Sequence, residues 1–399
     1  MHCNKVFNTR ICLRALAVSL LTGLAVLGYL VKNTTLISTW SYQAKEEDSR
    51  VWTTQSAGTD WTLKELWTNF KNILNQPCDS PVANFSQTCG KEASACTRDC
   101  IRPLSNNTEK RLNDVITSPN LTLSKQQRDA ILSLSESIPE SDVIFLSASS
   151  SNHYDEMQAM FHNLHTVVFP LIPNITVVLF DIGLTEDQRR KTELHCRCHV
   201  VRFPAEKFPP HMKTNICYSW KPVIVRATMD KVRQILVYQD ASIRWDQQLL
   251  AVINRTRTFG LQFHRNDYLS RISLHTLKQT FNYFGEEPCA FSPFPELEAN
   301  NGIYKKDPFV IRGLLEPWAR CALEASCMCP VDPGSVLSCN KPVAEHRCHR
   351  FDQSALGMIT AKLFNKDINR IFAPSYKYLD IRRDHRMANY FNSLDKPKV

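Results

Sequence analysis

The sequence lacks the short motifs that mark several common classes of enzyme. Its 399 residues contain no G-x-S-x-G nucleophile elbow, no H-E-x-x-H zinc motif and no Walker phosphate loop. These absences speak against hydrolases, metalloproteases and nucleoside triphosphatases. Internal repeats, low-complexity tracts and a basic-aromatic module are also missing. We therefore expect no nucleic-acid partner.

Acidic residues are absent before Glu46, whereas Lys5, Arg10 and Arg14 lie in the same stretch. The net charge of +9 comes from 48 basic and 39 acidic residues. Without those three cations the balance is 45 against 39, or +6. A charge this mild suits attraction to anionic small molecules or glycans.

One long apolar run, Ile11–Val31, dominates the start of the chain. A run of about 20 apolar residues can cross a membrane, and the positive-inside rule places the preceding cations in the cytosol. We expect a cytosolic tail (1–10), a transmembrane signal-anchor (11–31) and a lumenal remainder. A cleaved signal peptide is the alternative, but its apolar core is usually 7–15 residues long and a clean cleavage site is missing here.

The least interrupted part of the apolar run, Ala15–Val31, gives about 26 Å of helix, which favours thinner membranes such as those of the Golgi.

Cysteine is abundant, with 15 residues in total. Excluding Cys3 and Cys12 leaves 13, a density that suits disulfides in an oxidising compartment. Because 13 is odd, at least one thiol is free or bonds to another chain, so a homodimer, disulfide-linked or non-covalent, is conceivable. Six glycosylation sequons also favour lumenal exposure; they begin at Asn33, Asn84, Asn106, Asn120, Asn174 and Asn254.

Two regions follow the apolar run. Residues 32–140 are polar and weakly periodic, and we expect a partly disulfide-tied stem (Cys78, Cys89, Cys96, Cys100) with short helices over 60–74 and 124–137. Residues 141–399 begin with alternating strands and helices, which indicate an α/β fold with a mostly parallel sheet. We expect strands at 142–147, 175–180, 199–203 and 234–238, and helices at 153–168, 185–194 (with Thr185 as N-cap) and 222–232. Further on we expect a strand at 259–263, a loop at 287–308, and helices at 271–281, 317–325 and 353–363.

Polar residues just after the strands are the first site candidates, because ligands of such sheets bind at the carboxyl ends of strands. These residues are Ser147, Ser149, Asp181 and Asp240. Asp240 with Ser242 could hold Mn²⁺ or Mg²⁺ and neutralise a diphosphate. The alternative is that Asp240 only caps a turn, and a neutral Ser242 weakens the metal interpretation.

Two further positions have alternative interpretations. Asp352 and Gln353 precede an apolar helix, where Asp352 could cap the helix or the pair could face a sugar as hydrogen-bonding or acid/base groups. Lys221 could add positive charge near phosphates or be a solvated lysine at a helix start.

The cysteine clusters favour disulfides over zinc. Cys321 and Cys327 are each expected to be disulfide-bonded, and zinc is the less favoured alternative for the wider group of Cys321, Cys327, Cys329, Cys339 and Cys348 with His346 and His349. We also favour disulfide bonding for Cys196 and Cys198.

Six strings in order, VIFLSASSSNHYDEM, VVLFDIGLTEDQ, CYSWKPVIV, VYQDASIRW, EPWARCALEASCMCP and HRFDQSALGMI, resemble a largely uncharacterised family of type II membrane proteins with a glycosyltransferase-A-like domain. The resemblance covers residues 141–399 and implies a mixed sheet flanked by helices. It implies nucleotide binding by Ser147, Ala148, Ser149 and Tyr154. The Asp-x-Asp metal motif of related enzymes corresponds to Asp240-Ala241-Ser242, with a departure at Ser242, and a late Asp-Gln pair corresponds to Asp352-Gln353.

The sequence thus predicts a Golgi or ER lumenal glycosyltransferase that moves a sugar from a nucleotide-sugar donor to a glycan or glycoprotein acceptor. The alternative is a catalytically inactive, membrane-anchored lumenal module that binds glycans or proteins.

Overall fold

The computed structural model describes residues 61–78, 100–266, 270–339, 347–373 and 378–395. The expected cytosolic tail, the signal-anchor, the first part of the stem and the sequons at Asn33 and Asn84 lie outside the described residues. Within the described ranges, no helix is both long and apolar enough to cross a membrane. Asn106, Asn120, Asn174 and Asn254 are all exposed.

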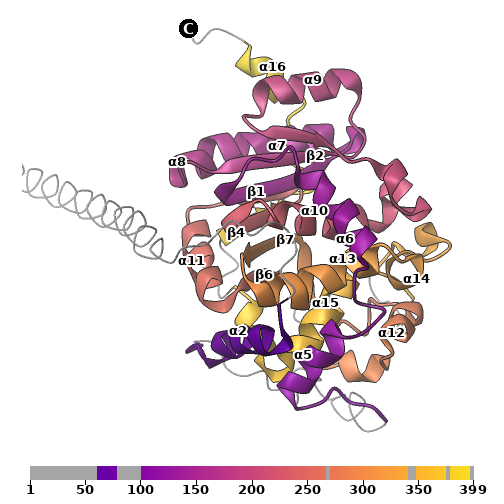
Figure 1. The fold of residues 1–399 in the computed structure, drawn as a ribbon. Helices are drawn as coiled ribbons and strands as arrows, with labels where there is room; N and C mark the ends of the chain where they lie inside the picture. The colour runs from indigo at the N-terminus through magenta and orange to yellow at the C-terminus, as the bar shows by residue number, and fades with distance from the viewer. Residues whose placement is uncertain (1–60, 79–99, 267–269, 340–346, 374–377, 396–399) are drawn as a thin grey trace, which may run out of the picture. The chain divides into compact units, whose positions relative to one another are not determined.

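A six-stranded mixed sheet forms the centre of the described part (Figure 1), in the order β3-β2-β1-β4-β7-β6. The strands are β1 (Ser141–Ser149), β2 (Thr176–Asp181), β3 (His199–Arg202), β4 (Val232–Gln239), β6 (Leu261–Arg265) and β7 (Leu297–Lys305). The strands β1 to β4 run parallel to one another, and β7 runs antiparallel to both β4 and β6. A separate pair joins β5 (Ile243–Trp245) to β8 (Leu379–Ile381). The expected α/β class with a parallel sheet is confirmed.

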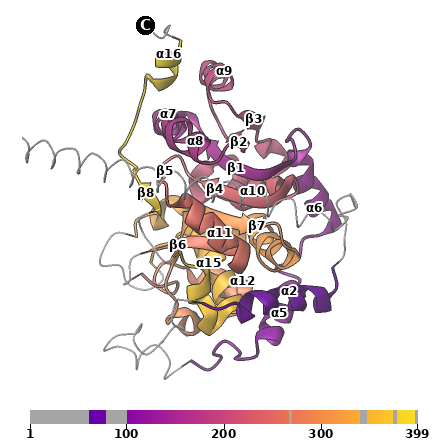
Figure 2. The same cartoon turned by 90° about the vertical axis from the view of Figure 1, so that its left-hand side faces the viewer.

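Helices cover this sheet, and Figure 2 shows them from a second side. From the start of β1 to the start of β4 the chain forms α7 (Tyr154–Asn163), continued by a π-helix (Leu164–Val168), then α8 (Phe169–Leu171), α9 (Glu186–His195) and α10 (Trp220–Met229). Later helices are α11 (Leu249–Phe259), α12 (Lys278–Phe284), α13 (Glu316–Ala322), α14 (Ala325–Met328), α15 (Phe351–Phe364) and α16 (Tyr390–Leu394). Thr185 begins α9 with a capping box, as its position predicts.

The two helices that position the candidate site are buried along their whole length. Every residue of α10 and of α15 is buried. Helix α10 packs against β1, β4 and α13, and α15 packs against β7 and α13. A helix surrounded on all sides by protein holds its side chains in fixed positions, which a site needs.

The region expected to be a loop at 287–308 contains a central strand instead. β7 lies between β4 and β6 and is buried over all but its last residue. Its sequence, LEANNGIYK, carries polar residues where a buried strand would usually be apolar. In the same stretch, α11 was not expected, and the helix expected at 271–281 is α12, several residues later.

The expected stem is also corrected, because residues 61–78 and 100–138 belong to the same compact unit as the sheet. Helices α2 (Leu63–Asn75), α5 (Thr108–Ile116) and α6 (Lys125–Leu132) carry buried apolar side chains. Phe70 of α2 stacks on Phe309 at 4.1 Å between ring centroids and meets Phe364 edge-on at 5.2 Å. Buried Arg111 of α5 donates hydrogen bonds to the carbonyls of Lys362 and Leu363. The folded domain therefore begins near residue 61 rather than 141.

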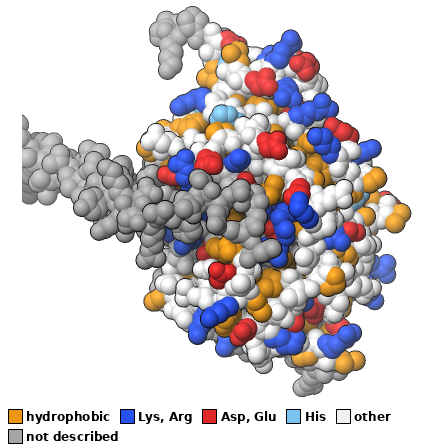
Figure 3. Space-filling model, viewed as in Figure 1, with side chains coloured by type: hydrophobic (Ala, Val, Ile, Leu, Met, Phe, Trp, Pro, Cys, Tyr) orange, Lys and Arg blue, Asp and Glu red, His pale blue; other side chains and the backbone are white. Residues whose placement is uncertain are grey.

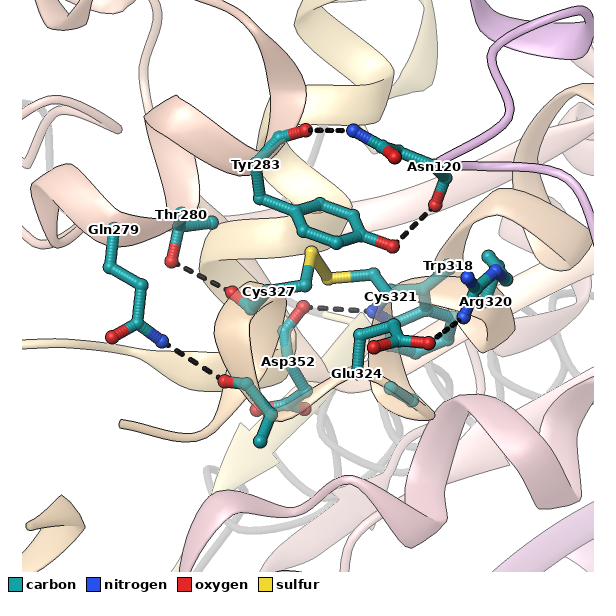
Figure 4. Close-up of a disulfide and its surroundings, with 12 residues drawn as sticks. Asn120, Gln279, Thr280, Tyr283, Trp318, Arg320, Cys321, Glu324, Cys327 and Asp352 are labelled. Atoms are coloured by element: carbon teal, nitrogen blue, oxygen red, sulfur yellow. Dashed lines mark hydrogen bonds and ion pairs between the residues drawn. A yellow bond between two sulfur atoms is a disulfide. The ribbon is translucent and has the colours of Figure 1, made fainter. Parts of the chain in front are cut away.

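The cysteines for which zinc binding was the alternative, Cys321, Cys327, Cys329, Cys339 and Cys348, all form disulfides. Cys321 bonds to Cys327 (Figure 4), which confirms that both are disulfide-bonded. The other bonds are Cys100–Cys289, Cys196–Cys198, Cys217–Cys329 and Cys339–Cys348. Of the described cysteines, Cys78 is free. Cys89, Cys96 and His346 lie outside the described residues.

Candidate functional site

The candidate site lies where the strand order reverses direction. From β1 the chain passes to β2 and β3 on one side, and then returns to β4 on the other side of β1. Ser147–Ser149 end β1, and Asp240 follows β4 directly. The carboxyl ends of parallel strands at such a reversal form the usual ligand crevice of an open α/β sheet.

The side chain of Asp240 contacts Tyr238 and Lys221, and the backbone of Asp240 closes the turn. Its backbone N–H donates to the carbonyl of Asn300 at 2.7 Å. Its Oδ1 accepts a hydrogen bond from the Tyr238 hydroxyl at 2.5 Å and lies 3.3 Å from Nζ of Lys221. The side chain stays 31% exposed, so one side of this carboxylate still faces outward. The turn that follows is closed by the backbone of Asp240, through its carbonyl and the N–H of Ile243.

Lys221 is a buried cation, so the interpretation as a solvated lysine is wrong. It lies in the first turn of α10 and is 3% exposed. Its Nζ is 2.8 Å from Oδ2 of Asp352 and donates to the carbonyl of Ala299 at 3.1 Å. Burial would lower the pKa of Lys221, but the charges of Asp240 and Asp352 outweigh burial and raise it. The ammonium group therefore stays charged at neutral pH.

Asp352 and Gln353 lie in the first turn of α15, but Asp352 does not cap the helix. The residue at the N-cap position is Arg350, without a side-chain cap, and Phe351 takes a left-handed backbone conformation with φ of 42°. The Asp352 carboxylate points to Lys221 instead. Burial raises the pKa of Asp352, while Lys221 opposes the shift. Gln353 Oε1 accepts from the Ala299 N–H at 3.5 Å.

The start of β7 contributes polar groups that the sequence analysis missed. Glu298 is buried and its Oε2 accepts from the Asn300 amide at 3.1 Å. Burial raises the pKa of Glu298. Glu296 accepts from Gln353 Nε2 at 3.4 Å and lies 2.9 Å from His275 Nδ1. The signal in the sequence was the run ELEANN inside an otherwise apolar strand pattern.

The residues expected to bind the nucleotide lie at the ends of β1 and β2. Ser147, Ala148 and Ser149 are buried, and the Ser147 hydroxyl has no hydrogen-bond partner among the described residues. Tyr154 begins α7, and burial raises its pKa to about 12. Asp181 holds its own loop, since its Oδ1 accepts from the N–H groups of Gly183 and Leu184 at 2.9 and 2.7 Å.

The residues at Asp240 fit a divalent cation poorly. The carboxylate already accepts a hydrogen bond from Tyr238 and pairs with an ammonium group. The second position of the motif is Ser242, a neutral and buried residue. Among the described residues, the clusters of three potential His, Cys, Asp or Glu ligands do not include Asp240. Mn²⁺ and Mg²⁺ bind through several oxygen ligands, usually carboxylates, so the predicted metal site of Asp240 and Ser242 lacks a suitable ligand set.

A surface hollow of about 290 Å³ lies elsewhere, beside the end of β3, where Ser137, Arg202 and Lys207 are among its lining residues. None of the converging groups described above lines it. We assign the site by the convergence of buried charges at the strand reversal, because binding sites hold a few precisely placed polar groups at such a reversal. On the face drawn in Figure 3, basic and acidic side chains are interspersed.

The chain is similar to several known proteins. Residues 105–226 match the profile of a family described as "Protein of unknown function (DUF1647)". The comparison with curated proteins finds no match.

Three solved structures are similar at low identity. The galactosyltransferase LgtC in complex with donor and acceptor sugar analogs is 13% identical over 44% of this chain, with a TM-score of 0.29. This chain spans only 59% of the length of LgtC. Mouse xyloside xylosyltransferase 1 is 14% identical over 59% of this chain and 84% of its own, with a TM-score of 0.32. Core-mannan synthase A of Aspergillus fumigatus, in its Mn/GDP form, is 9% identical over 58% of this chain and 72% of its own, with a TM-score of 0.33. TM-scores this low assign neither fold nor activity, so the α/β class rests on the sheet itself.

Proposed function

We propose that the protein is a glycosyltransferase that moves a sugar from a nucleotide-sugar donor to a glycan or glycoprotein acceptor. The observation that carries the proposal is the convergence of Lys221, Asp240 and Asp352 at the strand reversal. These residues come from α10, the end of β4 and α15, which are far apart in the sequence. The ordered resemblance of residues 141–399 to glycosyltransferase-A-like proteins supports the same function.

Each part of the site has a distinct role in this proposal. The end of β1, with Ser147, Ala148, Ser149 and the nearby Tyr154, binds the nucleotide; the orphaned hydroxyl of buried Ser147 is a free hydrogen-bonding group for it. Asp181, at the end of the neighbouring β2, orders the loop beside that nucleotide.

The remaining groups act on the diphosphate and the sugar. Asp240 positions the Lys221 ammonium group beside the diphosphate. Asp352, which pairs with Lys221, and the adjacent Gln353 form the polar wall near the sugar. No step is assigned to a divalent cation, because the ligand set at Asp240 is poor.

We also propose a Golgi membrane location with the folded domain in the lumen, supported by the apolar run, the N-terminal cations and the bonded cysteines. Glycosidase treatment should then reduce the mass of the protein, and carbonate washing should leave it with the membranes. A soluble product that begins after residue 31 would contradict the anchor.

The function is tested by a donor screen on the purified full chain in detergent. We expect nucleotide sugars of one base to raise the melting temperature by several degrees, because a ligand that binds only the folded state stabilises it. Asp352→Asn should weaken the shift produced by the sugar more than the shift produced by the free nucleotide. Glu286→Gln is the matched control, since it removes the carboxylate that pairs with another buried lysine, Lys362.

One combination of results would contradict the proposed transferase. If no nucleotide sugar stabilises the chain while a glycan array binds it, the protein is a lumenal glycan-binding module and not a transferase.

A further inference from the structure

The convergent site carries too little positive charge for a diphosphate. Lys221 is shared by two carboxylates, Asp240 and Asp352, and Glu298 lies nearby. A diphosphate adds about two negative charges, and burying unpaired charge is costly. Since a divalent cation has few suitable ligands here, the missing charge must come from another part of the chain.

The C-terminal segment passes directly beside the turn that carries Asp240. β8 pairs with β5, and the next residue, Arg382, donates its N–H to the carbonyl of Ser242 at 2.7 Å. Met387 then donates to the carbonyl of Asp155 at 3.0 Å, at the start of α7. Figure 2 shows this course from β8 towards α16. We call residues 382–387 the C-terminal strap.

Arg244 clamps the strap to the site. Its buried guanidinium donates to the carbonyls of Ala241 and Ile243 in the turn after Asp240, at 2.5 and 2.8 Å. It also donates to the backbone carbonyls of Glu156 in α7, at 3.3 Å, and of His385 in the strap, at 3.2 Å. Burial lowers the pKa of Arg244 to about 10, so it remains charged at neutral pH. One side chain thus joins the β4–β5 turn, α7 and the strap.

Two arginines of the strap are available for a ligand. Arg383 and Arg386 are exposed, and neither forms an ion pair with a carboxylate in the described part of the chain. Arg382 differs, because its guanidinium lies 3.2 Å from Asp380. Asp384, between the two free arginines, is exposed as well.

Both free arginines act electrostatically on residues of the site. Burial raises the pKa of Glu298, and Arg383 opposes that shift. Arg383 likewise opposes the rise that burial causes in the pKa of Tyr218, whose ring faces Lys221. The hydrogen bond to Glu156 raises the pKa of His153, Asp240 adds to the rise, and Arg386 opposes it. The backbone contacts of the strap at Ser242 and Asp155 place Arg383 and Arg386 on the segment between the turn after Asp240 and the start of α7.

We propose that Arg383 and Arg386 of the strap, together with Lys221, form a diphosphate subsite that needs no divalent cation. The inference rests on the proposed function, because it names the groups that hold the donor's diphosphate. Guanidinium groups suit this role, since their paired N–H donors match phosphate oxygens. Arg383 and Arg386 supply the donors for the phosphate oxygens, and Lys221, held in place by Asp240 and Asp352, adds a third cation to the subsite.

The test measures binding of UDP, GDP and inorganic pyrophosphate to the full chain by calorimetry, after EDTA treatment and again with Mn²⁺. We expect at least one of these ligands to bind without metal, with less than a twofold change in Kd when Mn²⁺ is added. The double variant Arg383→Gln/Arg386→Gln should raise Kd at least tenfold with an unchanged melting temperature, because both residues are exposed. Arg382→Gln is the matched control and should change Kd less than threefold, since Asp380 already occupies that guanidinium.

A second variant separates this subsite from a metal site. Asp240→Asn keeps an oxygen that can accept from Tyr238 and Lys221 but removes the negative charge near the phosphates, so it should strengthen metal-free pyrophosphate binding. At a metal site the same substitution would abolish binding.

The outcomes are distinguishable. Binding that requires Mn²⁺, or equal affinity in the double variant, overturns the cationic subsite and leaves the proposed transferase standing. No binding of any of the three ligands under either condition overturns both.

Discussion

Lys221 and its two carboxylates form a buried charged group in which each member depends on the others. Replacing the ammonium by an apolar side chain leaves two carboxylates close together without the cation that pairs with both. We expect Lys221→Met to lower the free energy of unfolding by about 3–5 kcal/mol, the usual cost of breaking a buried ion pair from one side. Urea denaturation of the full chain measures it.

A paired variant tests the reason for that loss. Lys221→Met/Asp352→Asn removes one of the two orphaned charges, so it should be more stable than Lys221→Met alone. Equal stability of the two variants would show that packing, and not charge, accounts for the cost.

His349 gives the fold a dependence on pH. Burial lowers its pKa to about 4, and its Nε2 lies 3.3 Å from the Thr280 hydroxyl. A histidine in the unfolded chain has a pKa of about 6.5. Below that pH, His349 is therefore protonated in the unfolded chain but stays neutral in the folded chain. The stability due to neutral His349 is present above pH 6.5 and is lost as the pH falls towards 4, by roughly 3 kcal/mol in all.

The measurement compares urea midpoints of the wild type and His349→Gln between pH 7 and pH 4. Other groups add to the acid dependence of both proteins, so the difference between the two slopes isolates His349. Parallel slopes would contradict the depressed pKa.

Among the elements, β7 is the one whose position matters most for the site. It lies between β4 and β6 and brings Glu298, Ala299 and Asn300 next to Asp240. We expect the backbone amides of residues 297–305 to exchange with solvent as slowly as those of β1, because they lie in the sheet interior. Exchange within seconds, as in an exposed loop, would contradict the strand.

The elements that the sequence predicts well are those with a clear apolar period. β1 and β2 follow from short apolar runs and α7 from apolar residues at helical spacing, while α9 follows from Thr185 as its N-cap. β7 could not be found this way, because its polar residues serve the neighbouring site and break the apolar pattern.

The candidate site was predicted in part. Asp240 follows from its place after a strand, whereas the contact of Lys221 with Asp352 depends on how α10 and α15 pack, which no local pattern contains. Arg383 and Arg386 lie in a segment without periodicity, and only the fold reveals its course past Ser242.

At the scale of the whole molecule, the N-terminal helices are part of the core. Phe70 is fully buried between Phe309 and Phe364. We expect Phe70→Ala to lower the free energy of unfolding by about 3–5 kcal/mol, the usual cost of removing a buried aromatic ring. Trp67→Ala, at a partly buried position on the same helix, is the control and should cost less. The measurement is urea denaturation of the full chain. A small effect of Phe70→Ala would show that residues 61–75 are not part of the core and belong to the stem.

The bond between Cys100 and Cys289 also constrains the order of events during synthesis. The two cysteines are separated by 189 residues, and the chain leaves the ribosome from its N-terminus. Cys100 is therefore made long before its partner exists. Until then its thiol must stay reduced or be held by another thiol. Phe70 has to wait longer still for its neighbour Phe364, which lies 294 residues later in the chain. The domain consequently completes its core only after α15 has been made.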